Sequence, residues 1–209
     1  LWERERLRHS HGWCPFIQME NAFAKLAFAM IDEDKPIDVA YDYALAHIQN
    51  DSLIQVGKNA NIIEERDGQI RFYHQLMQEY FAAIELHQLG LNARLLKTQY
   101  VLGHRVAGKW DQVVVAMCGI AEEPDAIINA ISEANPYLAA QCVRSGMRVP
   151  SPILIDIVVH LLKMTQDKSQ RLSRVSQQAL NLLATDALPG LVNVLVDRNS
   201  IEAINNLSE

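Results

Sequence analysis

One Asp-Gly pair, Asp67-Gly68, limits the folds open to this chain more than any other feature. It separates two short strand-like segments, residues 61–65 and 69–73, in a chain whose other apolar residues recur at helical spacing. Asp-Gly favours the two-residue loop of a β-hairpin, because both positions of that loop need a positive φ. The sequence therefore predicts a small β-hairpin within a chain that is otherwise mostly α.

Three helices are predicted before the hairpin. The first covers residues 15–31, the second begins near Pro36, and the third covers residues 52–60. Three helices followed by a hairpin are the order of a winged-helix domain, which we predict over residues 15–73. Residues 1–14 are then the end of a preceding segment. The apolar positions of the first two helices are Phe16, Met19, Phe23, Leu26, Ala27 and Met30, followed by Val39, Tyr43, Leu45, Ala46 and Ile48.

Helical spacing returns after the hairpin. We expect residues 74–109 to hold one long helix, ending near Leu89, and a connecting helical region. An apolar stripe on this helix is typical of a helix that buries one face. The stripe consists of Leu76, Met77, Tyr80, Phe81 and Ile84.

Short amphipathic helices separated by prolines are predicted over residues 110–209. Seven positions between residues 127 and 143 match seven between 191 and 207 at an offset of 64, which indicates an internal repeat. We therefore predict a HEAT-like α-solenoid of about three stacked helix pairs, with an ordinary antiparallel bundle as the alternative. The small residues Ala139, Ala179 and Ala203 would let neighbouring helices approach closely. The middle pair is expected to present Ile155, Val158, Val159 and Leu162 on one helix, and Val175, Ala179 and Leu183 on the next.

The composition indicates a globular chain in a reducing compartment. Of its 209 residues, 49% are hydrophobic and 21% charged, which allows a real core. The longest apolar stretch, residues 113–121, is about half of the ~20 residues that a transmembrane helix needs, and the N-terminus lacks a signal peptide. Cys14, Cys118 and Cys142 form no CxxC pair, so we expect no disulfide, a cytoplasmic location and no membrane partner. Because the chain lacks an initial Met and ends within a helical pattern, we also expect it to be a piece of a longer protein.

One segment resembles a phosphate-binding loop but fails at its last position. Residues 103–109 fit GxxxxGK, yet Trp110 follows where a Ser or Thr must hold the magnesium ion. The preceding residues 94–100 are also too polar for the buried strand that such a loop requires. We predict instead a loop that ends in Trp110, packed under the first solenoid helix.

No metal or catalytic site is predicted. His9, His11 and Cys14 lie close in sequence, but a structural zinc site needs four ligands and no fourth is nearby. His74 and Glu79 are five residues apart, which places them ~140° apart around a helix, too far to act on one substrate atom. No local signature of a nucleophile and its base is present, so we expect no enzymatic activity from this chain alone.

DNA binding is the weaker interpretation of a winged helix here. The third predicted helix carries a single cation, Lys58, and the hairpin tip, residues 64–67, is net negative. The chain as a whole has a net charge of −6. Because neutralised phosphates supply most non-specific affinity for DNA, we do not expect a nucleic-acid partner.

Residues 70–83 carry a family resemblance. Their sequence is Ile70-Arg71-Phe72-Tyr73-His74-Gln75-Leu76-Met77-Gln78-Glu79-Tyr80-Phe81-Ala82-Ala83. It resembles the signature F-x-H-x-x-x-Q-E-[YF]-[FL]-A-A, which closes the winged-helix domain of NACHT-type signalling ATPases, the STAND class that includes NOD-like receptors. Residues 26–30 and 61–63 are similar to the same domain, and residues 110–146 to the helical repeats that follow it in bacterial members.

The resemblance implies a nucleotide-controlled switch. In this family ADP or ATP, with Mg, lies between an ATPase core and the winged helix, and a histidine at the position of His74 contacts the ADP phosphate in the resting state. It further implies that the repeats sense a ligand or partner, that activation produces an oligomer, and that the protein signals in innate immunity or antiviral defence. His74 alone would otherwise be taken as a structural histidine, although the start of a helix also favours an anion.

The ATPase core itself is not identifiable in these residues. No phosphate-binding loop, Walker B carboxylate or sensor arginine is recognisable, so we expect the core upstream of Leu1 and no tight nucleotide binding by this chain. The resemblance assigns Phe72, Phe81 and Ile84 to the core, and Gln78, Glu79 and Tyr80 to holding the helix in place. A stand-alone HEAT-like scaffold or adaptor for protein–protein interaction is the alternative function.

Overall fold

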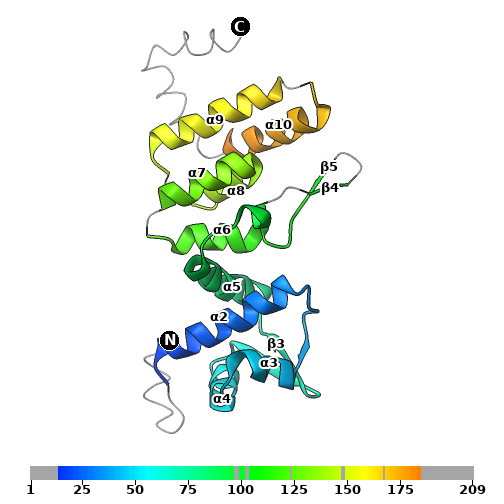
Figure 1. Cartoon of the computed structure of the whole chain (residues 1–209), viewed down its shortest axis with the longest axis vertical. Helices are drawn as coiled ribbons and strands as arrows, with labels where there is room; N and C mark the ends of the chain where they lie inside the picture. The colour runs from blue at the N-terminus through cyan, green and yellow to red at the C-terminus, as the bar shows by residue number, and fades with distance from the viewer. Residues whose placement is uncertain are drawn as a thin grey trace. The chain divides into compact units, whose positions relative to one another are not determined.

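The computed structural model describes residues 14–96, 99–101, 104–122, 124–146, 149–166 and 168–184, and these residues are mostly helical with a small antiparallel sheet (Figure 1). The chain divides into two compact units, which we call unit 1, ending at Gly90, and unit 2, beginning at Leu91.

Unit 1 contains four helices and a three-stranded sheet among its described residues. The sheet order is β1-β3-β2, and all its pairs are antiparallel. The predicted hairpin is confirmed: Asp67 and Gly68 join β2 to β3 with φ values of 52° and 73°. In chain order the elements are α2 (Phe16–Asp32), β1 (Val39–Ala40), α3 (Tyr41–Ile48), α4 (Asp51–Asn59), β2 (Ile63–Arg66), β3 (Gln69–Phe72) and α5 (Gln75–Leu89).

The strand β1 corrects the prediction for the second helix, which begins at Tyr41 and not near Pro36. Val39 is paired with Ile70 of β3, and both side chains are buried. A β-branched residue packs well against a neighbour across a sheet, and this contact holds the segment extended. The spacing of apolar residues near Pro36 could not reveal that this segment pairs with β3, which lies about 30 positions further along the chain.

The core of unit 1 is aromatic. The ring centroids of Phe23, Phe72 and Phe81 lie 5.8 to 6.3 Å from one another, which joins α2, β3 and α5. Helix α5 packs along α2 (Figure 1). A Cβ atom added to Gly57 on α4 would lie only 2.3 Å from Cζ of Phe23, so glycine lets α4 approach this cluster. The predicted burial of Phe72, Phe81 and Ile84 is confirmed.

The predicted apolar stripe on α5 is wrong at its N-terminal end. Leu76 is 75% exposed and Tyr80 41% exposed, whereas Phe81 and Ile84 are buried. The buried face of α5 is instead centred on Ala82, Ala83 and Leu86, because small alanines allow α2 to approach closely. Phe16, at the start of α2, is also exposed rather than buried.

Unit 2 begins with an irregular segment and continues with helices. Its described elements are η1 (Ala93–Leu96), β4 (Gln99–Val101), β5 (His104–Val106), α6 (Asp111–Ile120), α7 (Pro124–Ala134), α8 (Pro136–Arg144), α9 (Ser151–Thr165) and α10 (Gln170–Ala184). The prediction of a connecting helical region before residue 109 is wrong at β4, which pairs antiparallel with β5 inside the segment predicted as a loop before Trp110. Trp110 itself is buried, at the start of α6.

The helices of unit 2 pack as sequential neighbours, α7 against α8 and α9 against α10, while α8 also contacts α6 and α10 (Figure 1). Helix α10 buries Val175, Ala179 and Leu183 as predicted. Helix α9 follows the prediction only in part: Val158 is buried as expected, but Leu162 is exposed and Ile155 and Val159 are only partly buried, while Ile157 and Leu161 are buried instead. The packing partners of α9, not its own spacing, select which stripe is covered.

Several predictions lie outside the described residues. These are the segment 1–13, with His9 and His11, and the second copy of the proposed repeat, residues 191–207, with Ala203.

Among the helices that the structure describes, none is both long and apolar enough to span a bilayer.

Candidate functional site

His74 occupies the N-terminal end of α5. Its backbone is extended, with φ −137° and ψ 142°, and its carbonyl accepts hydrogen bonds from the N–H groups of Met77 and Gln78 at 3.0 and 3.3 Å. The preceding residue, Tyr73, is tied to the start of the hairpin, because its N–H donates to the carbonyl of Ile62, just before β2, at 2.9 Å. The backbone at His74 is thus held from both sides, while its side chain is exposed and makes no capping hydrogen bond.

Three large side chains that lie near His74 in the sequence, Tyr73, Leu76 and Tyr80, are exposed. The ring of Tyr73 meets the imidazole edge-on at 4.8 Å, and Leu76 and Tyr80 lie one turn apart on the same face of α5. We call Tyr73, His74, Leu76 and Tyr80 the His74 surface. Large apolar side chains gathered at the surface are typical of contact sites for other molecules.

The first turn of α5 provides donors for an anion. Among the described residues, no acceptor lies within hydrogen-bond distance of the N–H groups of Gln75 and Leu76. Such unpaired N–H groups carry partial positive charge and favour a phosphate or carboxylate. The imidazole and these N–H groups are close in sequence and belong to the same helix start.

The other residues of the 70–83 signature have structural contacts. Phe72, Phe81, Ala82 and Ala83 are buried and fix α5 against α2. Glu79 accepts a hydrogen bond from Nε2 of Gln75 at 2.8 Å, within the first turns of α5. The signature therefore has a buried part that positions the helix and an exposed part that includes His74.

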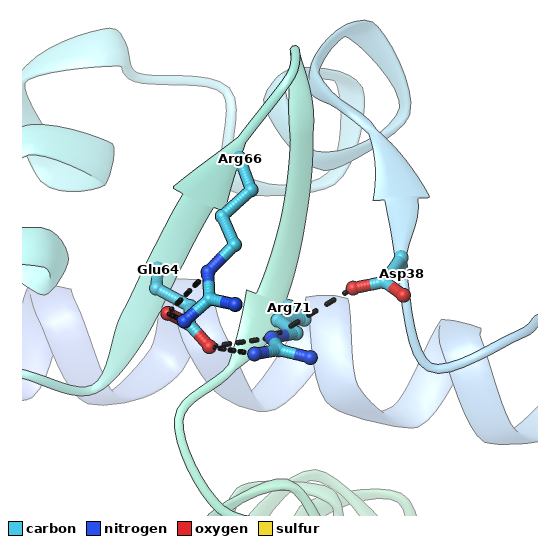
Figure 2. A network of polar contacts seen from close by, with 4 residues as sticks. All are labelled: Asp38, Glu64, Arg66 and Arg71. Carbon is cyan, nitrogen blue, oxygen red and sulfur yellow. Dashed lines mark hydrogen bonds and ion pairs between the residues drawn. The ribbon is translucent and has the colours of Figure 1, made fainter.

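The cations of α4 and the hairpin are already paired with carboxylates, as Figure 2 shows for the arginines. Arg71 donates to Glu64 and lies 3.8 Å from a carboxylate oxygen of Asp38, and Arg66 is 3.0 Å from Glu64. On α4, Lys58 pairs with Glu65 at 2.6 Å. This neutralisation leaves little positive charge on α4 and the hairpin for contact with a phosphate backbone.

No metal site is found among the residues that the structure describes: no three His, Cys, Asp or Glu side chains are grouped so that they could hold an ion. Cys14, which is near His9 and His11 in the sequence, is half-buried just before α2. Strand β4 precedes the GxxxxGK segment and β5 lies within it, and the two are antiparallel, unlike the parallel strand that precedes a phosphate-binding loop.

Sequence reasoning missed a buried ion pair in unit 2. The Arg105 guanidinium lies 2.5 Å from the Asp111 carboxylate, and the two side chains are only 7% and 5% exposed. The guanidinium also stacks over the ring of Tyr137 at 4.3 Å, and the N–H of Gly108 donates to Asp111. The sequence signal that could have indicated a role for Asp111 is its place in the first turn of a predicted helix, because an Asp there often accepts hydrogen bonds from nearby N–H groups.

A pair of thiols was missed as well. Cys118 and Cys142 are 24 residues apart in sequence, but their sulfur atoms are 3.4 Å apart. Nothing in their spacing could have indicated this contact.

In comparisons with family models, with curated proteins and with solved structures, nothing matches this chain. Its function is therefore inferred from its own residues and from the resemblance of residues 70–83.

Proposed function

We propose that this chain is the regulatory and sensor portion of a NACHT-type ATPase switch in the cytoplasm. In this proposal unit 1 is a winged-helix domain that stabilises the ADP-bound resting state, and unit 2 is a HEAT-like region that senses a ligand or partner. The observation that carries the proposal is the exposed His74 on a rigidly held helix start, at the position where the signature has its phosphate ligand.

The order of elements in unit 1 supports a winged helix. Helices α2, α3 and α4 come before the β2–β3 hairpin, and β1 completes the small sheet at the other edge of β3. The hairpin leads directly into α5, so the end of β3 determines where His74 lies. This is the arrangement that a wing followed by a signature helix requires.

The chemistry of the helix start suits a diphosphate. The imidazole of His74 would donate to a phosphate oxygen, and the N–H groups of Gln75 and Leu76 would add to the positive potential. The nucleotide, with its Mg, would be held mainly by an upstream ATPase core, whose hydrolysis chemistry this chain does not supply. A hydrogen bond to a charged group contributes ~1.5 to 3 kcal/mol, which changes a closed-to-open ratio by roughly tenfold to over a hundredfold.

The apolar residues of the His74 surface fit the same role. Tyr73, Leu76 and Tyr80 are exposed in this chain, and an upstream core docked over His74 would remove them from water. Separation of the core from unit 1 would then expose apolar surface on both parts. Such newly exposed surfaces are suited to the oligomerisation that follows activation in this family.

The helices of unit 2 support a sensing role. Successive helices pack in pairs, and the buried Ala139 and Ala179 lie on α8 and α10, which contact each other. Stacked helix pairs leave extended surfaces that bind partners. The innate-immune or antiviral context follows from the resemblance and belongs to the same proposal.

The test compares two histidines of one helix in the longer protein that we expect to contain this chain. His74→Leu should release ADP about tenfold to a hundredfold faster and raise the oligomer fraction without stimulus. His87→Leu is the matched control, because His87 is exposed in the last turn of α5. ADP release is measured with a fluorescent analogue and oligomers by mass photometry. Unchanged ADP release and oligomer fraction in His74→Leu would exclude the role of His74.

The alternative function is a stand-alone scaffold whose partner binds the helices of unit 2. It predicts no GxxxxGK[ST] strand-loop-helix about one domain upstream and no nucleotide in the purified longer protein. The switch predicts bound ADP in that protein and little or none in the 209-residue chain. Nucleotide released by denaturation and quantified by chromatography separates the two.

A further inference from the structure

Two thiols of unit 2 meet in its interior. Cys118 lies on α6 and Cys142 on α8, and their sulfur atoms are 3.4 Å apart, within the range of a thiol–thiol hydrogen bond. Cys118 is 4% exposed and Cys142 is fully buried. Both cysteines are free, and the proposed nucleotide switch uses neither.

The packing of the two helices holds this contact. Helices α6 and α8 pack against each other, and α8 also buries the small Ala139 and Ala140, which precede Cys142 by three and two positions. A disulfide bond is about 2.05 Å long, so the sulfur atoms would have to approach by a little more than 1 Å. Side-chain rotation and a small helix shift can supply that movement.

We propose that Cys118 and Cys142 are a site of oxidative modification, where a hydroperoxide converts the dithiol into a reversible disulfide between α6 and α8. In the first step one sulfur, as thiolate, attacks the peroxide oxygen, which gives a sulfenic acid and releases water or an alcohol. In the second step the other sulfur attacks the sulfenic sulfur, and the S–S bond forms as hydroxide leaves and takes up a proton to become water. The two thiols lose two electrons and two protons, and the peroxide gains them.

The environment makes the first step slow and the second fast. The Cys118 thiol beside it and burial in the apolar interior raise the pKa of the Cys142 thiol, because a thiolate is poorly stabilised there. The first oxidation therefore depends on transient opening of the α6–α8 contact. Once one sulfur is a sulfenic acid, its partner is already at contact distance, so closure competes well with further oxidation. In a reducing compartment the pair would return to thiols.

The crosslink would stabilise unit 2 independently of nucleotide. It closes a loop of about 25 residues that includes α7, and a loop of that size raises the folding equilibrium constant by on the order of a hundredfold. Helices α6 and α8 would then be fixed relative to each other in the region that we propose for sensing.

The experiment uses the full 209-residue chain with Cys14→Ser, so that only the buried pair can react. After treatment with hydrogen peroxide under native conditions, the intact mass should fall by two hydrogen atoms, and no thiol should be titratable after unfolding. Dithiothreitol should restore both thiols. Amide exchange in peptides from α6 and α8 should slow in the oxidised protein.

Two controls make the result decisive. With Cys142→Ser added, Cys118 should be trapped as a sulfenic acid by dimedone or proceed to sulfinic acid, with no internal crosslink. The chain that retains Cys14 shows that the peroxide dose oxidises a half-buried thiol. The proposal is overturned if Cys118 and Cys142 stay titratable at that dose, if their disulfides join separate chains, or if the internal crosslink forms only in denaturant.

Discussion

The two units differ in where they place their polar groups. In unit 1 the ion pairs among the described residues lie on or near the surface, and the core is formed by Phe23, Phe72, Phe81 and aliphatic side chains. In unit 2 an ion pair is buried, and the buried polar or charged residues found in the described parts of the chain all belong to this unit. They are Asp111, Asn135 and Ser176.

The difference follows from how much of the backbone of each unit is hydrogen-bonded within helices and sheets. Unit 1 satisfies most of its backbone through helices and a sheet, so apolar packing can complete its interior. Unit 2 must attach the irregular segment before α6, whose backbone groups need partners. Asn135 supplies two of the contacts, since its Nδ2 donates to the carbonyl of Leu96 and its Oδ1 accepts from the N–H of Leu138. A buried polar contact of this kind is costly when broken and specifies a single arrangement.

The largest expected effect is from Asp111→Ala, which leaves the Arg105 guanidinium buried without its carboxylate. We expect a loss of about 3 to 5 kcal/mol of unfolding free energy, confined to unit 2. Hydrogen exchange followed by mass spectrometry should show faster exchange in α6 and α8, with α2 and α5 unchanged. The double variant Arg105→Met/Asp111→Leu should recover most of the loss. An equal loss in the double variant would mean that the pair is not the cause.

Next in size is Asn135→Ala, for which we expect a loss of about 3 kcal/mol, because it removes the cap of α8 and leaves the Leu96 carbonyl without a donor. Denaturant unfolding of unit 2, followed by Trp110 fluorescence in a Trp2→Phe/Trp13→Phe background, measures it. The control is Asn181→Ala, a substitution at an exposed position of α10, which should change the unfolding free energy little. A loss below about 1 kcal/mol in Asn135→Ala would contradict this role.

Two separate glycine-to-alanine substitutions, one in each unit, should change the unfolding free energy in opposite directions. Gly57→Ala brings a Cβ to 2.3 Å from Phe23, and we expect unit 1 to lose about 2 kcal/mol by overpacking. Gly119→Ala meets no atom within 4 Å on α6, so unit 2 should gain about 0.5 to 1 kcal/mol from helix propensity. Thermal melts of both variants provide the test. A stabilised Gly57→Ala would show that the Phe23 cluster is loosely packed.

The smallest expected effect is from Glu64→Gln on the hairpin. Burial disfavours the charged carboxylate, but the hydrogen bond from Arg71 and the charges of Arg66 and Arg71 hold the pKa of Glu64 below its usual value of 4.5. Its contribution to stability is therefore present above pH 4.5 and is lost as the pH falls through the lowered pKa. The melting temperature of Glu64→Gln should be slightly lower than that of the unsubstituted chain at pH 7 and should converge with it in acid. A difference that persists unchanged in acid would exclude the ion pair as its source.

Local sequence signals were sufficient for several elements and for part of the site. The Asp67-Gly68 hairpin, α2, α4 and α5 follow from turn chemistry and helical spacing, and the aromatic core residues Phe72 and Phe81 are buried as expected. The placement of His74 between a hairpin and a helix follows from the same signals.

Contacts between distant segments required the tertiary structure. The strand β1 exists because Val39 meets Ile70, and α5 packs against α2 with Phe81 and its alanines buried while Leu76 and Tyr80 stay exposed. The proposed contact of His74 with a phosphate remains a prediction, and it rests on the resemblance of residues 70–83 to the family signature.

By itself the sequence determined the β2–β3 hairpin and most of the helices, because helical spacing and turn residues act over a few neighbouring positions. Only the tertiary structure decided that Arg105 and Asp111 are buried together and that the sulfur atoms of Cys118 and Cys142 touch. Those contacts depend on which faces of separate elements pack, and packing selects among stripes that look equivalent along the chain.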